Sequence, residues 1–597
     1  MADFRNILLV YPHVPNTTYW SFTYALPFIR KKNTMPPLGL ITVAGLIPSS
    51  FNLKLIDMNI EPLKIADITW ADAVLISSMI VQKDSFEDVV AICNRLRKPV
   101  VAGGPYPTSS FQDIAGVDHF VLGEAEELVR PLLEELRQGR AQRIYRPDRR
   151  PELTETVIPR FDLLNMNAYA DMAVQYSRGC PFTCEFCDIW PVYGNRPRLK
   201  SVGNILAELD TLVRLGWEGS IFIVDDNFIG NKHRVKSELL PALREWQQRH
   251  RYVFQFFTEA SINIAEDDDL LAGMRDAGFS EVFIGIETPS TKSLEEGGKR
   301  QNLRVDMEKA IQKIHQFGIG VMAGFILGFD NDTEEIFDRQ ISFIQRNGIP
   351  KAMVGLLTAL PGTKLYERLC CEGRLLKKTI GNNTHTLSTN FRTRMNSKAL
   401  REGYTRLLDT IYDYNLKNYF ARCNKLLDSI GPSDHFQRAI HFKEVRTFFA
   451  SLLRQPFTPY GYQYLKFLFR NLIKHRKTFA EAVTYGVIGH HFYTITQEMI
   501  KIDRITATLE DRYAFLRDQL NQVSQSVVGS SLEAIKPVQE LWNQCNQVLL
   551  DLRRKIDTLH VDFRGDISTY YASASEEMIA LFHQYKDRLD QCQCSRS

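Results

Sequence analysis

Two series of short apolar runs, each run followed by a helix-like segment, constrain the fold of this 597-residue chain more than any other feature. The first series lies within residues 1–140 and has five runs, at residues 7–11, 53–57, 73–79, 100–104 and 120–123. Strands that alternate with helices predict a parallel sheet with helices on both faces. We therefore expect an α/β chain that begins with a doubly wound parallel sheet.

The second series lies within residues 166–375. Its six runs are at residues 173–176, 220–224, 253–257, 281–286, 321–327 and 353–357. Six strand and helix units in succession predict a partial (β/α)6 barrel, whose functional residues should follow the carboxyl ends of the strands. The polar, proline-containing segment 141–165 between the two series is typical of a linker.

The strand pattern stops after residue 375, and the remainder predicts an all-α C-terminal region. Residues 376–503 are rich in aromatic side chains and predict a helical domain of unknown role. Residues 504–597 keep apolar side chains at spacings of three and four, which is typical of amphipathic helices that pack together. We expect a helical extension there.

Charge and hydropathy narrow the range of partners. The net charge of +3 gives no general basic field, so we expect no nucleic acid partner. The start of the chain lacks the features of a signal peptide, and we expect a cytoplasmic protein. No long apolar run predicts a spanning helix, but residues 464–477 mix aromatic, aliphatic and basic side chains as an interfacial helix does. Peripheral contact with the inner membrane surface and a buried helix with a basic end both remain open.

Three of the ten cysteines form a tight group, Cys180, Cys184 and Cys187, in the run Ser-Arg-Gly-Cys-Pro-Phe-Thr-Cys-Glu-Phe-Cys. Three thiolates at this spacing suit a 4Fe-4S cluster and leave one iron without a protein ligand. A structural zinc ion is the alternative, but it takes four ligands, and no nearby His or Cys completes the set. The group follows the first predicted barrel strand, where barrel enzymes place their sites.

The Cys-x3-Cys-x2-Cys spacing, with Phe186 before the last cysteine, resembles the radical S-adenosylmethionine (SAM) superfamily. The resemblance implies that the open iron binds the amino and carboxylate groups of SAM. An electron from the cluster then cleaves the sulfonium and releases a deoxyadenosyl radical. A low-potential donor such as ferredoxin or flavodoxin is implied as the electron source.

Further matches follow later strands, and the resemblance implies that they contact SAM: Asp225, Asp226, Glu259, Glu287, Gly324 and Gly328. The acids would meet the methionine amino group or the ribose hydroxyls, and the glycines would lie against adenine. Whether Glu259 or Glu287 is the main ribose contact stays open. Each residue also has an ordinary structural explanation as a helix cap or a turn.

A doubly wound sheet before such a barrel resembles the Rossmann-like cobalamin-binding domain of cobalamin-dependent radical SAM enzymes, and the resemblance covers residues 1 to about 370. The implied cobalamin contacts are Ser77, Ser78, Met79, Gly103, Gly104, Gly123 and Glu124. The cobalt-ligating pattern Asp-x-His-x-x-Gly would fall at residues 57–62, which lack the His and the Gly. Cobalamin without a histidine on cobalt is therefore implied, and a degenerate domain that binds nothing is the alternative.

Residues 193–198, 225–232 and 328–333 resemble a subgroup of these enzymes with a C-terminal helical domain, which includes the hopanoid C-2 methylase. The resemblance implies methylation of an unactivated carbon in a small-molecule or lipid substrate, such as a hopanoid. The alternatives are a cobalamin-linked radical cyclase or rearrangement enzyme, and a non-catalytic iron-sulfur and cobalamin binding or sensor protein. The residues alone leave the substrate and the oligomeric state open.

Overall fold

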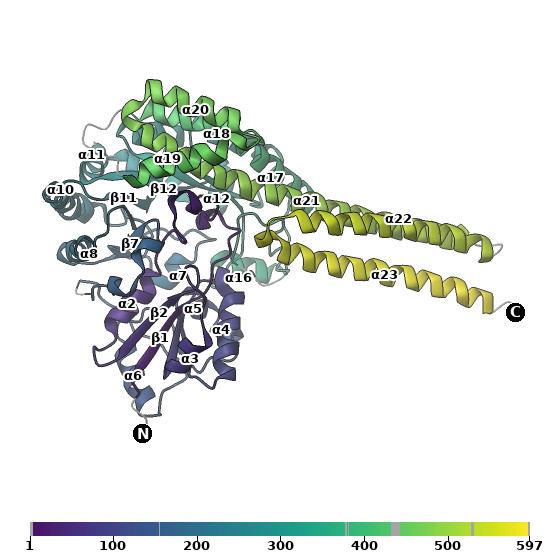
Figure 1. The fold of residues 1–597 in the computed structure, drawn as a ribbon, viewed down its shortest axis with the longest axis horizontal. Coiled ribbons are helices and arrows are strands. Elements are labelled where there is room, and N and C mark those ends of the chain that lie inside the picture. The colour runs from purple at the N-terminus through teal and green to yellow at the C-terminus, as the bar shows by residue number, and fades with distance from the viewer. Residues whose placement is uncertain are drawn as a thin grey trace. The chain divides into compact units, whose positions relative to one another are not determined.

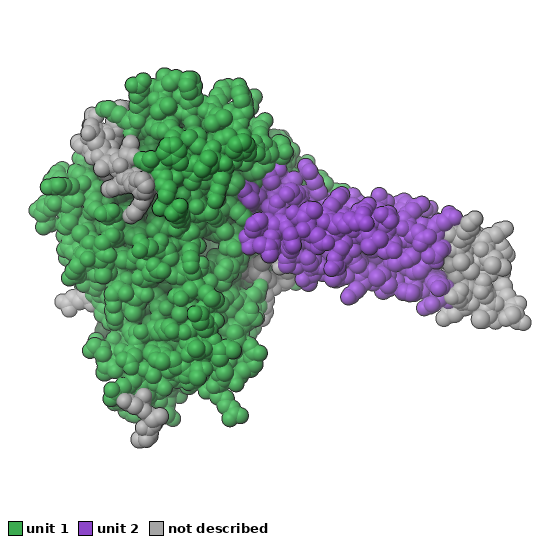
Figure 2. Space-filling model, viewed as in Figure 1, with its two compact units in different colours: residues 1–493 green, residues 494–597 purple. Residues whose placement is uncertain are grey.

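The computed structural model describes residues 4–154, 156–376, 379, 381–430, 442–526 and 531–594. Parts of the predicted helical domain and of the predicted helical extension lie outside the described residues. The chain forms two compact units, residues 1–493 and residues 494–597, which Figure 2 colours separately.

The first sheet is parallel throughout, with the strand order β2-β1-β3-β4-β5-β6. Its strands are β1 (Asn6–Tyr11), β2 (Asn52–Asp57), β3 (Ala73–Ser77), β4 (Val100–Gly103), β5 (His119–Val121) and β6 (Ile144–Tyr145). The predicted doubly wound sheet is confirmed, and it has one strand more than the five runs predicted. The extra strand, β6, lies within the segment that we predict to be a linker.

Side chains alternate along β1, because successive residues of a strand point to opposite faces. Leu8 and Val10 pack in one core, with residues of α4 (Lys83–Arg95). Ile7 and Leu9 pack in the other core, with residues of α2 (Leu38–Leu46) and α6 (Val129–Arg137). The further helices here are α1 (Leu26–Ile29), α3 (Ile65–Trp70) and α5 (Pro105–Ser110). Both faces are covered, so the carboxyl edge is where a ligand can approach the sheet.

The second sheet is also parallel, and its order β14-β13-β12-β11-β10-β7 follows the chain. Its strands are β7 (Met172–Val174), β10 (Ser220–Ile223), β11 (Gln255–Ala260), β12 (Phe279–Glu287), β13 (Gly320–Leu327) and β14 (Ala352–Leu356). Each of the six predicted runs overlaps one strand. A short antiparallel pair, β8 (Ser177–Arg178) and β9 (Arg198–Leu199), stands beside the sheet.

Helices connect these strands in the order expected of a partial barrel. They are α7 (Ile189–Tyr193), α8 (Val202–Arg214), α9 (Lys232–Arg234), α10 (Leu240–Arg249), α11 (Asp268–Ala277), α12 (Thr291–Glu296), α13 (Arg300–Leu303), α14 (Met307–Gln316), α15 (Glu335–Arg346) and α16 (Lys364–Cys371). Every strand therefore points its carboxyl end to the same edge, where the predicted site residues collect.

The helices that follow are α17 (Ser397–Ile411), α18 (Lys417–Ser429), α19 (Phe442–Arg454), α20 (Gly461–Lys474) and α21 (Phe479–Ser526). Figure 1 places α18, α19 and α20 at the end of unit 1 remote from the N-terminal sheet. The loop after β1 reaches this region, where the Tyr19 and Phe492 rings are 5.3 Å apart and His491 Nε2 lies 3.2 Å from the Tyr19 carbonyl oxygen. The helical region is thus packed against the N-terminal part of the chain.

The second unit is built from the end of α21, α22 (Ser531–Thr558) and α23 (Arg564–Cys594). Its core contains Leu509 and Leu516 from α21, Leu549 from α22 and Ile567 from α23. Amphipathic spacing explains this packing. Among the residues that the structure describes, no helix is both long enough and apolar enough to cross a membrane.

Candidate functional site

The three clustered cysteines lie in the loop between β8 and α7, at the carboxyl edge of the second sheet. Cys184 is buried, and Cys180 and Cys187 are half-buried. The loop closes on itself where the Cys180 amide donates to the Gly194 carbonyl at 3.2 Å. Gly179 has a φ of +95°, and a Cβ there would come within 2.9 Å of the Gly194 oxygen. Only glycine fits at this entry to the cluster loop.

Two adjacent acids brace that entry. The Asp225 carboxylate accepts hydrogen bonds from the Tyr176 amide at 2.7 Å and from Ser177 Oγ at 2.6 Å, and Asp226 accepts from the Gly179 amide at 2.7 Å. Burial raises the pKa of Asp225 to about 7 and that of Asp226 to about 6. Both acids therefore hold the backbone that leads into the cluster loop, and their contact with SAM stays a prediction.

The thiols fit a cluster of iron and sulfur. Asn227 Nδ2 lies 3.9 Å from Cys180 Sγ, and Gln301 Nε2 lies 3.9 Å from Cys184 Sγ, so that amide donors face the sulfurs. Burial raises the pKa of the Cys180 and Cys187 thiols, and metal binding would deprotonate them. Within the described residues, no three Cys, His, Asp or Glu side chains surround one point as ligands of a single ion. In a cluster, by contrast, each cysteine binds a different iron.

A buried ion pair lies beside the loop. Lys299 Nζ is 2.5 Å from Glu287 Oε1 at the end of β12. Burial alone would lower the pKa of Lys299, but the Glu287 carboxylate and the cluster thiols hold that pKa above its usual range. Glu287 has a φ of +63°, and a Cβ at Gly285 would overlap its carboxylate. Glu287 is therefore fixed by its own backbone and by a lysine.

Glu259, the other acid predicted to contact SAM, has a different environment. It lies near the end of β11, and among the described residues its carboxylate makes no hydrogen bond or ion pair. Burial, followed by the neighbouring Asp226 carboxylate, raises the pKa of Glu259 to about 7. A half-buried carboxyl group with these properties is available to a polar ligand.

The two glycines predicted to lie against adenine have structural roles of their own. A Cβ at Gly324 on β13 would come within 2.9 Å of the Phe283 ring on β12. Gly328 has a φ of +101°, and its amide donates to the Asp332 carboxylate at 2.9 Å. Neither position tolerates a side chain easily, and the contact with adenine stays a prediction.

The residues predicted to contact cobalamin meet at the carboxyl edge of the first sheet. Gly104, after β4, has a φ of +90°, and a Cβ there would lie 2.7 Å from Ser77 Oγ and 3.1 Å from the Ser78 amide, after β3. Ser78 Oγ is buried and makes no hydrogen bond within the described residues. Met79 is 40% exposed. This edge thus combines closely packed loops, an unsatisfied hydroxyl and an exposed thioether, which fits a large ligand with both polar and apolar parts.

Gly103, the last residue of β4, and Gly123, in the loop after β5, lie at the same edge. Gly103 pairs with Val121 across β4 and β5, and its carbonyl accepts a hydrogen bond from the Ser78 amide at 3.3 Å. The Gly123 amide donates to Thr108 Oγ1 at 2.9 Å. All of the predicted cobalamin contacts before Glu124 therefore lie at the carboxyl end of β3, β4 or β5 or in the loop that follows it.

The structure gives Glu124 a partner that the sequence did not indicate. Its carboxylate accepts from Arg178 Nη1 at 2.7 Å and from Arg198 Nη2 at 2.6 Å, and Arg178 also pairs with Glu126 at 2.6 Å. Arg178 stands two residues before Cys180, and Arg198 begins β9. These side chains join the loop after β5 directly to the cluster loop, so the contact of Glu124 with cobalamin stays a prediction.

Sequence reasoning also missed residues on the other side of the cluster loop. A Cβ at Gly297 would come within 3.1 Å of both the Phe186 and the Phe329 rings. Arg368 of α16 pairs with Glu185, between Cys184 and Cys187, at 2.6 Å. The run Gly297-Gly298-Lys299 was the one available signal, because paired glycines allow close approach of backbone.

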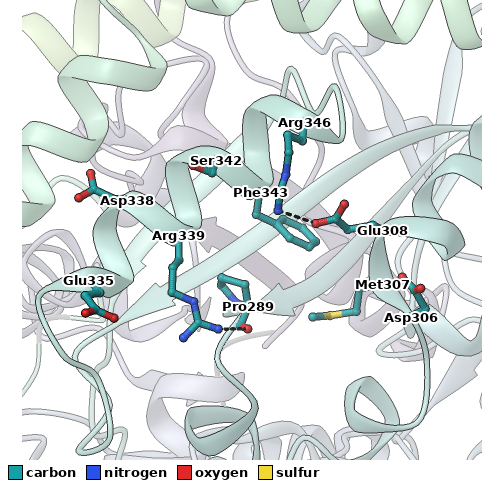
Figure 3. Close-up of a pocket in the computed structure, with 10 residues that line it drawn as sticks. All are labelled: Pro289, Asp306, Met307, Glu308, Glu335, Asp338, Arg339, Ser342, Phe343 and Arg346. Carbon is teal, nitrogen blue, oxygen red and sulfur yellow. Dashed lines mark hydrogen bonds and ion pairs between the residues drawn. The ribbon is translucent and has the colours of Figure 1, made fainter.

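A surface hollow of about 580 Å³ lies elsewhere in unit 1 (Figure 3). It is bordered by α14 and α15, with Arg346 paired to Glu308 at 2.7 Å and Arg339 donating to the Pro289 carbonyl at 2.8 Å. None of the predicted cofactor residues lines it. The candidate site is therefore the pair of carboxyl edges and not this hollow.

Comparison with known proteins identifies the families of two parts of the chain. Residues 174–344 match the Radical SAM superfamily, and residues 363–504 match a family described as Domain of unknown function (DUF4070). An uncharacterized methyltransferase of Synechocystis sp. is 42% identical over 70% of this chain and 78% of its own length. The hopanoid C-2 methylase of Rhodopseudomonas palustris is 36% identical over 62% of this chain and 71% of its own length.

The fold also resembles a solved structure, that of the cobalamin-dependent S-adenosylmethionine radical enzyme OxsB with aqua-cobalamin and S-adenosylmethionine bound. The similarity covers 92% of this chain and 84% of that chain, with a TM-score of 0.54 and 15% sequence identity. At this identity the likeness concerns the fold, which is the order of sheet, barrel and helices described above.

Proposed function

Because the chain belongs to the radical SAM superfamily, and within it to the methyltransferase family of these two relatives, we propose that it is a cobalamin-dependent C-methyltransferase. The observation that carries this proposal is the direct connection between the two predicted cofactor edges. Glu124 follows the first sheet, and its partner Arg178 precedes the cluster cysteines. This ion pair between the two cofactor edges suits an enzyme in which two cofactors act on one substrate.

When bound, the cluster and SAM supply a carbon radical, and cobalamin supplies a methyl group. Cys180, Cys184 and Cys187 would hold the cluster, with Asn227 and Gln301 donating to sulfur. The Glu259 carboxylate would accept hydrogen bonds from the ribose hydroxyls of SAM, because it has no protein partner within the described residues. Glu287, by contrast, is paired with Lys299. The chain's part is thus to bind and orient the cofactors.

The first sheet would bind cobalamin across the loops at 77–79, 103–104 and 123. The buried Ser78 hydroxyl is available for a polar group of the cofactor, and Met79 offers an apolar contact. The residues at 57–62 give no histidine for cobalt. Asp57 is instead buried, and it accepts a hydrogen bond from the Tyr169 hydroxyl at 2.8 Å. We therefore propose cobalamin without a protein histidine on cobalt.

A hydrophobic substrate with an unactivated carbon, such as a hopanoid lipid, is the substrate that we propose. The hopanoid C-2 methylase among the relatives supports this choice. A low-potential protein such as ferredoxin or flavodoxin would supply electrons. An enzyme located in the cytoplasm, at the inner membrane surface, would have access to such a substrate.

The test is anaerobic reconstitution of the full chain with iron, sulfide and hydroxocobalamin, followed by reduction with SAM that carries a labelled methyl group. We expect cobalamin retention, deoxyadenosine and, with hopanoid lipid present, a product that carries the labelled carbon. Cys184→Ala is the control and should abolish deoxyadenosine. Deoxyadenosine with an unlabelled product would indicate a cyclase or a rearrangement enzyme. A fully loaded chain that makes no deoxyadenosine with any tested substrate would favour a binding or sensor protein.

A further inference from the structure

Helix α20 is apolar on its exposed side as well as on its buried side. Six large apolar residues in and just before it are at least 43% exposed, and we call them the α20 face: Phe457, Tyr462, Leu465, Phe469, Leu472 and Ile473. From Tyr462 onward their spacing of three, four, three and one places them along one side of the helix. Large apolar side chains that gather on the exposed side of a helix are typical of a surface that contacts a partner or a membrane.

Comparison with α18 shows that this exposure belongs to α20 and the segment before it. Phe467 on the buried side of α20 stacks on Phe420 of α18, with ring centroids 4.7 Å apart. The exposed positions of α18 include Lys417, Lys425 and Ser429, as expected of a solvated helix. Of the 23 large apolar side chains that are exposed among the described residues, nine lie within residues 445–473. Such concentration marks an interaction surface.

The charge of this region indicates the kind of partner. Residues 442–477 contain eight Lys or Arg and one Asp or Glu, although the whole chain has a net charge of only +3. Asp428 of α18 pairs with Arg470 at 2.7 Å and with Lys474 at 2.8 Å. Within the described residues, Lys466, Arg476 and Lys477 make no ion pair. Their charge is available to an anionic partner.

We propose that the α20 face, with Lys466, Arg476 and Lys477, is a docking surface for an anionic lipid membrane, on which α20 lies parallel to the interface. An amphipathic surface of this kind inserts apolar side chains between lipid headgroups, while basic residues meet their negative charge. A second copy of the chain is disfavoured, because a two-fold contact would bring two such basic segments together. An anionic lipid surface offers both apolar depth and negative charge.

The fold leaves room for this arrangement. Figure 1 shows α20 at the end of unit 1 remote from the N-terminal sheet, so the sheet does not cover it. The docking surface does not depend on the identity of the methylated substrate. Vesicle binding therefore tests it separately from the proposed methyl transfer.

The experiment is co-sedimentation of the full chain with two kinds of vesicle, phosphatidylcholine alone and an equimolar mixture of phosphatidylcholine and phosphatidylglycerol. We expect binding to the mixture that is about tenfold or more tighter than binding to phosphatidylcholine, and that weakens as salt is added. The double substitution Phe469→Ser with Ile473→Ser should weaken binding to the mixture at least about tenfold. Ile65→Ser on α3 is the matched control, because Ile65 and Phe469 are both 67% exposed, and it should change nothing.

A second variant tests the charges. Lys466→Glu, Arg476→Glu and Lys477→Glu together should abolish the preference for the anionic vesicles. Lys309→Glu, Lys398→Glu and Arg554→Glu, at exposed positions elsewhere, make the same change in net charge and should preserve it. Circular dichroism establishes that each variant is folded.

Two results would overturn the proposal. One is equal or absent binding of the folded wild-type chain to both kinds of vesicle. The other is a wild-type dimer, seen by light scattering, that the Phe469→Ser and Ile473→Ser variant converts to a monomer, because the α20 face would then be a protein interface.

Discussion

Replacing Glu124 by Gln removes a carboxylate that faces two largely buried guanidinium groups. Its side chain is only 3% exposed, and those of Arg178 and Arg198 are 11% and 13% exposed. Arg178 keeps a second partner, Glu126, at 2.6 Å. Arg198 has no other carboxylate partner among the described residues and keeps only carbonyl acceptors, at Pro151 and Tyr193. The substitution therefore leaves one arginine of the network without a counter-charge.

The magnitude follows from burial. Removing one partner of a buried ion pair costs about 3–5 kcal/mol, and the retained Glu126 places this case at the lower end, about 3 kcal/mol. If opening of the cluster loop breaks the network, its amides should exchange about 150-fold faster, since about 1.4 kcal/mol corresponds to a factor of ten. Glu238→Gln is the matched control. Its pair with Arg234 is 42% exposed on both sides, so solvent screens the pair and its loss should leave exchange in the cluster loop unchanged.

Native-state hydrogen exchange read by mass spectrometry resolves these effects. Peptides that span residues 176–199 report on the cluster loop, and peptides from β12 and β13 show whether the barrel itself stays closed. Exchange in residues 176–199 of the Glu124→Gln protein that stays within about threefold of wild type would refute the reasoning, because the buried network would then contribute no more than the surface pair.

Two further outcomes follow from backbone geometry and from burial. Gly104→Ala should destabilise the first sheet by about 2 kcal/mol, because the new Cβ overlaps Ser77 and the residue keeps a strained positive φ. It should also weaken cobalamin binding, measured by equilibrium dialysis. Gly139→Ala is the control: its φ is +69° but its surroundings are open, so it should add only the backbone strain. Burial lowers the pKa of His490 to about 4 and that of His491 to about 3. As pH falls below about 6.5, both histidines therefore become protonated in the unfolded chain while they stay neutral in the folded chain. The stability that these histidines contribute to the folded chain is therefore full above about pH 6.5 and is lost as pH falls, by about 2 kcal/mol for each histidine at pH 5. Thermal melting of the His490→Gln variant should show a smaller loss of stability between pH 6.5 and pH 5 than that of the wild-type chain.

The two sheets could be predicted because their strands are apolar runs bounded by turns. The six barrel strands and the first five strands of the N-terminal sheet all fall on predicted runs, and the alternation of strand and helix indicates that the sheets are parallel. Strand β6 could not be predicted, because its two residues are too short to show a period. Only pairing with β5 identifies it as part of the sheet.

The site was predictable where its chemistry is local in the sequence. Cys180, Cys184 and Cys187 fall within eight residues, so their spacing alone indicates a cluster. The partners of the loop are not local: Glu124 lies 54 residues before Arg178, and Gln301 lies 117 residues after Cys184. Nothing in a single sequence joins such positions, because their proximity results from how the loops of two sheets meet.

The partners of the cluster loop also bear on the segment that matches a family of unknown function. Glu185, inside the loop, pairs with Arg368 of α16, and its carbonyl accepts the Leu365 amide at 3.0 Å. Both partners fall within residues 363–504, the match to a family of unknown function. The loop is thus held by Glu124 on one side and by α16 on the other, and a chain that ended before α16 would lose one of the two supports. The start of the segment that matches this family therefore belongs to the structure of the cluster site itself.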